Sequence, residues 1–264
     1  MPDLPAPVAA VCDTFLSAVP DGLVTGLYLR GGIGFGEWVP GHSDVDFVVT
    51  LAERPGPPEV AALRLAHQAV AERHGGQPHF DGPHVLASDL AQPPDLCPEV
   101  PAVLMHEFRE QGRNEISPVG WHELARHGVT VTGPALDTLG IWTDDAVLRA
   151  HTVGNLDTYW GGLAEACAAA PLQAARDDAC EWVVPGVARL DHLLVTGDQT
   201  AKSLAVRWGL AHYPERFHRV LRESLRLREG AFDPQYVILA ERGDDVTAFA
   251  SYVVAAGTAV SRRP

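Results

Sequence analysis

Residues 23–51, LVTGLYLRGGIGFGEWVPGHSDVDFVVTL, contain the pattern that decides the fold of the first half of the chain. An apolar run leads into the pair Gly31 and Gly32, and Asp44 and Asp46 open a second apolar run. This pattern predicts two buried strands joined by a turn-rich segment. Because side chains alternate along a strand, we expect Asp44 and Asp46 on the same side, about 7 Å apart along the backbone.

These residue types favour a site for phosphate and divalent cations. Two carboxylates at a strand end repel one another unless a cation lies between them. Gly31 and Gly32 lack a Cβ, so their N–H groups can approach a phosphate, and a helix beginning after them would direct its positive end at the same anion. For either feature alone, the alternative is a glycine-rich hairpin with a solvated Asp-x-Asp. The two features in this order point to the functional interpretation.

The combination of Gly31-Gly32, Ser43 and Asp44-x-Asp46 resembles the signature of the nucleotidyltransferase superfamily of the DNA polymerase beta type. The resemblance implies that Asp44 and Asp46 bind Mg²⁺, as a pair of ions, and that Gly31, Gly32 and Ser43 contact the triphosphate of ATP. Many members have Ser where this chain has Gly32. That difference removes one hydroxyl contact to the triphosphate.

Asp81 is the acidic residue of a third predicted strand, residues 79–87. Metal-dependent nucleotidyl transfer needs a third carboxylate near the pair, either as general base or as a metal ligand, and the sequence leaves these two roles open. The alternative is a surface Asp in a turn beside Gly82. His79 and His84 are not included in the predicted site, because a lone His is more often a surface or core residue than a ligand.

The pattern of elements changes near residue 140. Before it, the sequence predicts helices and strands in alternation: helices 7–19, 59–74 and 118–127, a fourth strand 102–109, and a short strand 129–134. After it, helical runs dominate: 144–169, 178–196, 200–211, 214–229 and 241–258. We therefore expect an α/β (α+β) nucleotidyltransferase domain with a mixed sheet, residues 1–140, and an all-α helical-bundle domain, residues 141–264.

Residues 182–210 resemble the helical domain of the aminoglycoside (3'')(9) adenylyltransferases, through Arg189, Val195-Thr196-Gly197 and Lys202. The segment 121–134 is also similar to the end of that family's first domain. The resemblance implies that Arg189 and Lys202 contact the nucleotide phosphates. The family has a Glu where this chain has Asp81, so the general base is one methylene shorter here.

The same resemblance implies the residues that hold the acceptor. They are acidic and aromatic: Phe108, where the family has Trp, and Asp177, Asp178, Glu181 and Trp182. For the acidic residues, the alternative is capping of a solvated helix start. For Lys202, it is a solvated side chain in a first helical turn, where a positive charge opposes the helix dipole unless an anion is near.

Composition narrows the class of partner. The net charge of −14 argues against nucleic acid, because nucleic-acid binders usually carry a basic patch, and it favours a small cationic acceptor. The four cysteines lack metal-binding or disulfide spacing, so we expect free thiols. No apolar run approaches the ~18 residues of a membrane span. We expect a cytoplasmic monomer with no membrane or nucleic-acid partner.

The sequence thus predicts an Mg²⁺-dependent enzyme that transfers AMP from ATP to a hydroxyl of an aminoglycoside or aminocyclitol of the streptomycin or spectinomycin type, and so confers antibiotic resistance. Two alternatives remain. One is a nucleotidyltransferase that adenylylates a protein partner, as an antitoxin does, or another small cationic acceptor. The other is a dinucleotide-binding turn at Gly32-x-Gly34-x-Gly36, which is disfavoured because residues 37–41 cannot begin the required helix.

Overall fold

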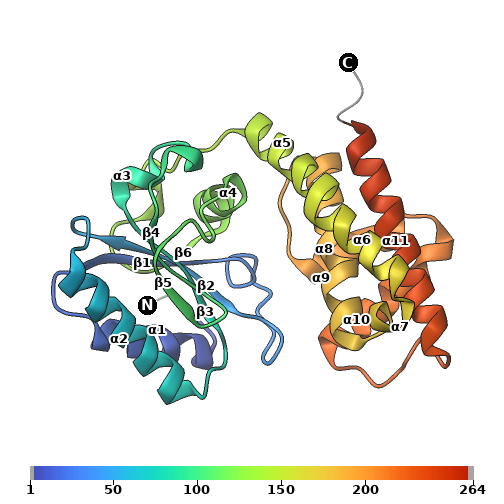
Figure 1. Cartoon of the computed structure of the whole chain (residues 1–264), viewed down its shortest axis with the longest axis horizontal. Coiled ribbons are helices and arrows are strands. Elements are labelled where there is room, and N and C mark those ends of the chain that lie inside the picture. The colour runs from blue at the N-terminus through green and yellow to red at the C-terminus, as the bar shows by residue number, and fades with distance from the viewer. Residues whose placement is uncertain (1–2, 261–264) are drawn as a thin grey trace. The chain divides into compact units, whose positions relative to one another are not determined.

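The chain divides after Asp144 into two compact units, and the computed structural model describes residues 3–260 (Figure 1). The N-terminal unit contains a six-stranded mixed sheet with the strand order β5-β4-β3-β2-β1-β6. Its strands are β1 (Val24–Arg30), β2 (Val45–Leu51), β3 (Phe80–Leu86), β4 (Val100–Leu104), β5 (Glu107–Gly112) and β6 (Val129–Thr132). The pair β2 and β3 is parallel and the other pairs are antiparallel.

Helices cover both faces of this sheet. They are α1 (Ala6–Ala18), α2 (Pro57–His74), α3 (Ala87–Leu90) and α4 (Pro118–His127), with 3₁₀ turns η1 (Pro94–Leu96) and η2 (Leu136–Thr138). Phe15 of α1 and Leu63 of α2 are buried with Phe47 of β2 on one face. Trp121 of α4 is buried with Val48 of β2 on the other. Because strand side chains alternate, the residues beside Phe47 face α4.

One predicted strand is in fact two. Residues 102–109, predicted as a single strand, form the end of β4 and the start of β5, which pair as an antiparallel hairpin. The chain reverses at Met105 and His106, whose φ angles are +50° and +65°. Turns of this kind usually contain Gly, Asn or Asp, so a turn at Met-His gives no signal in the sequence.

The C-terminal unit is helical. Its elements are α5 (Asp145–Asn155), the π-helical turn η3 (Leu156–Trp160), α6 (Gly161–Ala169), α7 (Pro171–Ala174), α8 (Asp177–Thr196), α9 (Lys202–His212), the 3₁₀ turn η4 (Glu215–Phe217), α10 (His218–Glu229) and α11 (Leu239–Val260). Residues 144–169, predicted as one helix, are therefore interrupted by the π-helical turn. The predicted fold class, an α/β domain followed by a helical domain, is confirmed.

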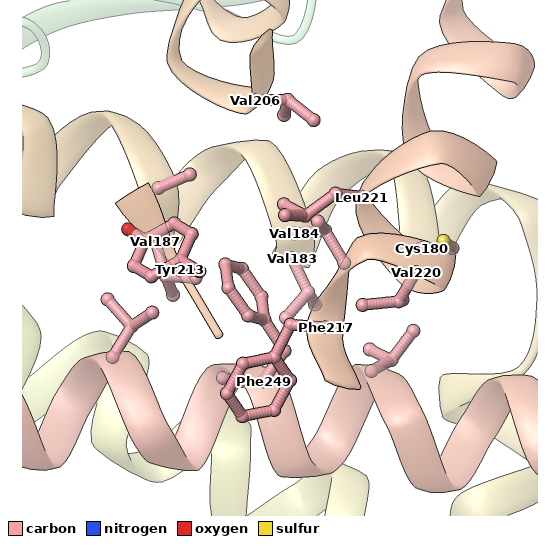
Figure 2. Close-up of a cluster of buried hydrophobic side chains, with 14 of the residues drawn as sticks. Cys180, Val183, Val184, Val187, Val206, Tyr213, Phe217, Val220, Leu221 and Phe249 are labelled. Carbon is pink, nitrogen blue, oxygen red and sulfur yellow. The ribbon is translucent and has the colours of Figure 1, made fainter. Parts of the chain in front are cut away.

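The core of the helical unit lies around α8 and α11 (Figure 2). Phe217 and Phe249 meet edge to face with ring centroids 5.4 Å apart, and Val183 and Val184 of α8 are buried in the same cluster. Such pairs add to the stability gained from buried apolar area. Across residues 3–260, every helix is either too short or too polar to cross a membrane.

Two histidines are buried in the aromatic core between α2 and the sheet. The Nε2 atoms of His67 and His84 lie 3.0 Å apart, and His84 Nδ1 lies 3.0 Å from the carbonyl oxygen of Pro101. Since a carbonyl only accepts, His84 carries its proton on Nδ1 and accepts at Nε2 the N–H of His67. Burial lowers the pKa of His84 to about 4 and lowers that of His67 well below its usual value. Both imidazoles are therefore neutral near pH 7.

We predict that acid destabilises the N-terminal unit through this pair. Above the ordinary histidine pKa of 6.5 neither state is protonated, and below it only the unfolded state gains a proton until the pH reaches the folded pKa. His84 alone then lowers the free energy of unfolding by about 2 kcal/mol between pH 7.5 and pH 5. Denaturant titrations at both pH values measure the change. A His84→Gln variant should lose less stability over the same range, and an equal loss would contradict the prediction.

Candidate active site

The glycine pair forms a tight turn at the end of β1. Gly31 has a φ of +61°, and the amides of Phe35 and Glu37 donate to the carbonyls of Gly31 and Gly32 at 3.1 and 2.8 Å. Residues 31–36 are turns, in agreement with the predicted turn-rich segment, and no helix begins directly after the glycines. Any anion bound here would meet turn amides and not a helix N-terminus.

Ser43 lies beside this turn. Its Oγ accepts the N–H of Val39 at 3.0 Å and lies 3.8 Å from the position that a Cβ on Gly32 would take. The hydroxyl proton of Ser43 remains available to a ligand, because the bond to Val39 uses only an acceptor lone pair. The structure therefore places Ser43 next to Gly31 and Gly32, the three residues predicted to contact the triphosphate.

Asp46 and Asp81 stand on adjacent strands. They are partners in the parallel register of β2 and β3, and both belong to the α4 face of the sheet. Asp46 is half-buried, Asp81 is buried, and Asp44, which precedes β2, is exposed. The Nδ1 atom of His79 lies 3.8 Å from Asp44 Oδ1 and 3.9 Å from Asp81 Oδ2. These contacts place all three predicted carboxylates around one end of β2 and β3.

The two oxygens of Asp81 have different surroundings. Oδ2 accepts the N–H of Met105, at the tip of the β4–β5 hairpin, at 2.8 Å. Oδ1 is buried and has no hydrogen-bond partner within residues 3–260. A buried carboxylate oxygen without a partner costs stability, so its retention is a sign of a ligand or a proton to be held there. Met105 thus fixes one oxygen while the other stays available.

A buried ionic cluster lies behind Asp46. Arg30, the last residue of β1 and the register partner of Asp46, forms ion pairs with Glu115 and, at 2.8 Å, with Glu123 of α4. Burial raises the pKa of Asp46 to about 7, Arg30 opposes that rise, and the charges of Glu115, Glu123 and Asp44 add to it. Asp46 therefore carries its negative charge at a cost that a bound cation would offset.

The residues present fit Mg²⁺. Within the described residues, no group of three or more His, Cys, Asp or Glu side chains is already gathered around a metal position. The donors offered are nevertheless carboxylate oxygens, the ligands that Mg²⁺ prefers, and Mg²⁺ needs only one or two of them with substrate phosphates and water. The unpartnered Asp81 Oδ1 and the raised pKa of Asp46 both favour a cation here.

Gly31 sets the position of Asp46. A Cβ on Gly31 would lie 2.1 Å from Asp46 Oδ2, whereas one on Gly36, with a similar φ of +68°, would meet nothing within 4 Å. We predict that Gly31→Ala lowers turnover by about 100-fold, because it displaces the carboxylate. Gly36→Ala is the matched control, since both variants strain a left-handed residue by about 1–2 kcal/mol. Equal turnover in the two variants, measured at saturating substrate, would contradict this role.

In the helical unit, Lys202 and Trp182 are in contact. Lys202 is the first residue of α9, and its Nζ lies 4.5 Å from the ring centroid of Trp182 on α8. Arg189, also on α8, is half-buried and has no carboxylate partner among residues 3–260. A half-buried guanidinium without an acidic partner is suited to an anionic ligand.

The three predicted acceptor carboxylates are each paired with an arginine. Asp177 Oδ1 lies 2.6 Å from the buried Arg242, Asp178 accepts two bonds from Arg176, and Glu181 Oε1 lies 3.3 Å from Arg228. These ion pairs were not anticipated from the sequence, because the arginines of Asp177 and Glu181 lie far away in the chain. Asp177 and Asp178 line an open pocket of about 540 Å³ whose other walls are Leu172, Ala175, Arg176, Leu239 and Arg242. Glu181 does not line it.

Phe108 lies away from the carboxylates. On β5 it packs against the core on the α1 and α2 face, with the Arg64 guanidinium 4.9 Å from its ring centroid and the ring of His67 5.9 Å away. Asp46 and Asp81 belong to the opposite face of the sheet. The structure does not bring Phe108 together with the predicted catalytic residues, so the expected contact of this ring with the acceptor has no support in its position.

The sequence interpretation missed several residues around the site. His79, set aside as a lone histidine, lies between Asp44 and Asp81. Its position two residues before Asp81 was the available signal, because β-strand alternation places both on one side. The partners of Arg30 gave no signal, since Glu115 and Glu123 are 85 and 93 residues away.

The chain is similar to known proteins in part of its sequence and in its fold. Residues 159–256 match the family model described as "aminoglycoside adenylyltransferase, C-terminal domain". Over 93% of this chain and 98% of the other, the structure is similar to that of spectinomycin adenyltransferase AAD(9) from Enterococcus faecialis, solved with ATP and spectinomycin, with a TM-score of 0.68 and 11% sequence identity. At that identity the likeness concerns the fold. A search of curated proteins gives no match.

Proposed function

We propose that this chain, whose residues 159–256 match the C-terminal domain of the aminoglycoside adenylyltransferases, transfers AMP from ATP to a hydroxyl of an aminoglycoside or aminocyclitol antibiotic of the streptomycin or spectinomycin type. One observation carries this proposal: Asp46 and Asp81 are register partners beside the Gly31 turn, and Asp81 keeps a buried oxygen unpartnered. The physiological role that follows is antibiotic resistance.

Each carboxylate of the site has a proposed task. Asp44 and Asp46 would hold Mg²⁺. Asp81 would either be a third ligand of the metal or accept, on its Oδ1, the proton of the attacking hydroxyl. Mg²⁺, when bound, neutralises triphosphate charge and stabilises the leaving pyrophosphate. Met105 keeps Asp81 in one rotamer through its N–H, so no reorganisation of that carboxylate is needed during the reaction. Arg30 holds the end of β1 beside Asp46 through its bonds to Glu115 and Glu123.

The phosphate ligands come from two kinds of residue. The turn amides of Gly31 and Gly32 and the hydroxyl of Ser43 supply neutral donors, which bind oxygens without adding charge. Lys202 and Arg189 supply positive charge. The polycationic acceptor is proposed to bind the exposed carboxylates of Asp177 and Asp178. Each carboxylate is paired with an arginine but still has lone pairs that can accept hydrogen bonds from an amine.

We predict that removing either positive charge weakens ATP binding. Lys202→Met or Arg189→Met should raise the KM for ATP by about 10- to 100-fold, the loss of one charge-assisted hydrogen bond, while the acceptor KM changes little. Arg222→Met, an exposed arginine on α10, is the control and should behave as wild type. A KM for ATP within twofold of wild type in both test variants would remove these residues from the phosphate site.

The activity itself is tested by pyrophosphate release. Purified protein with Mg-ATP should release pyrophosphate only when a suitable aminoglycoside or aminocyclitol is added, and EDTA should abolish the release. A panel that includes streptomycin, spectinomycin and kanamycin identifies the acceptor class. Release that needs no acceptor, or release unchanged by EDTA, would contradict the proposal.

A further inference from the structure

Trp182 is held in place from two sides. Its indole N–H donates to the hydroxyl of Tyr159 at 3.1 Å, and its ring stacks on Trp160 with centroids 6.0 Å apart and an interplanar angle of 27°. Tyr159 and Trp160 are consecutive residues of the π-helical turn η3. Such turns inside helices are frequent at functional sites because they reorient neighbouring side chains. The ring plane of Trp182 is therefore fixed.

The local sequence makes room for this arrangement. A Cβ on Gly186 would lie 2.0 Å from the Trp160 ring, so glycine at this point of α8 admits the indole that supports Trp182. Trp182 is 43% exposed and Tyr159 is 52% exposed, whereas Trp160, which supports them, is buried. The pair is thus a supported but accessible aromatic surface.

Lys202 contacts this aromatic surface. As the first residue of α9, its ammonium opposes the positive end of the helix dipole. It lies 4.5 Å from the Trp182 centroid, where the negative face of the ring attracts a cation. A lysine side chain also has four rotatable bonds, and a fixed ring restricts the positions that its ammonium samples.

We propose that Trp182, fixed by Tyr159, is a positioning residue that holds the Lys202 ammonium ready for a phosphate of ATP. The inference rests on the proposed function, because it takes Lys202 as a phosphate ligand. It changes the role expected for Trp182, which acts through Lys202 and not by touching the acceptor. It also assigns a role to Tyr159, which neither the motif nor the family resemblance singled out.

The variants separate the ring from the hydrogen bond. Trp182→Leu should weaken Mg-ATP binding by about three- to tenfold, Trp182→Phe should restore much of it because a ring face remains, and Tyr159→Phe should give a smaller loss. Trp208→Leu, which removes a half-buried tryptophan elsewhere in the helical unit, is the control for general loosening. Circular dichroism and thermal melts verify that each variant is folded. Calorimetric titration of Mg-ATP without acceptor measures the binding.

A double-mutant cycle with Lys202→Met decides the case. If Trp182 acts through Lys202, Trp182→Leu costs nothing further in the Lys202→Met background. Equal losses in both backgrounds, an unchanged affinity for ATP in Lys202→Met, or a Trp182→Leu effect confined to the acceptor KM would each overturn the inference. Acceptor-dependent pyrophosphate release by the wild type is measured in parallel. Its absence would overturn the proposed function, whereas its presence with an additive cycle would overturn the positioning role alone.

Discussion

We expect that replacing Asp46 or Asp44 with alanine abolishes the proposed Mg²⁺-dependent turnover while the protein stays folded. Loss of a metal-holding carboxylate removes several kcal/mol of transition-state stabilisation, which is about a thousandfold or more in rate. The fold should survive the change at Asp46, because Arg30 keeps its bonds to Glu115 and Glu123 and the carboxylate that is removed has a raised pKa of about 7.

Steady-state rates at saturating ATP and acceptor measure this effect, with denaturant unfolding to verify stability. Asp95→Ala, an exposed carboxylate in the same unit, is the control and should keep wild-type turnover. Turnover in Asp46→Ala or Asp44→Ala within threefold of wild type, with Mg²⁺ present, would mean that the corresponding carboxylate does not hold the metal.

Asp81→Asn lowers kcat by about 10²- to 10⁴-fold if Asp81 takes the proton of the acceptor hydroxyl. Asparagine keeps the size of the side chain and an oxygen for the N–H of Met105, but it has neither the charge nor the basicity of the carboxylate. ATP binding should therefore change far less than kcat.

The Mg²⁺ dependence of the same variant separates the two roles of Asp81. If Asp81 is a metal ligand, the variant should need a higher Mg²⁺ concentration for its half-maximal rate. If Asp81 is a general base, that concentration should be unchanged and only the rate should fall. An unchanged kcat in Asp81→Asn would mean that Asp81 has no part in catalysis and is only a structural residue of a turn.

Local patterns were sufficient to predict much of the active-site framework. Alternation along the strand predicted Asp44 and Asp46 on one side, and the structure places Asp46 opposite Phe47 as the register partner of Asp81. The order of glycine pair and carboxylates predicted the turn that Gly31 occupies. The family resemblance of the second half is confirmed, because residues 159–256 match the C-terminal domain of the aminoglycoside adenylyltransferases.

Tertiary contacts decided what the sequence could not predict. The reversal at Met105 and His106 carries no turn residue, yet it delivers the N–H that binds Asp81. Phe108 follows this reversal, and the register of the hairpin places it on the α2 face. Periodicity also does not reveal that Asp177 is paired with Arg242, which lies 65 residues later in the chain.

Mass spectrometry of the acceptor tests the central claim most directly. After incubation of the purified protein with Mg-ATP and streptomycin or spectinomycin, the antibiotic should gain one adenylyl group, and Asp46→Ala should leave it unmodified. An acceptor unchanged while ATP is consumed, or an adenylyl group found on a protein and not on the antibiotic, would contradict the account.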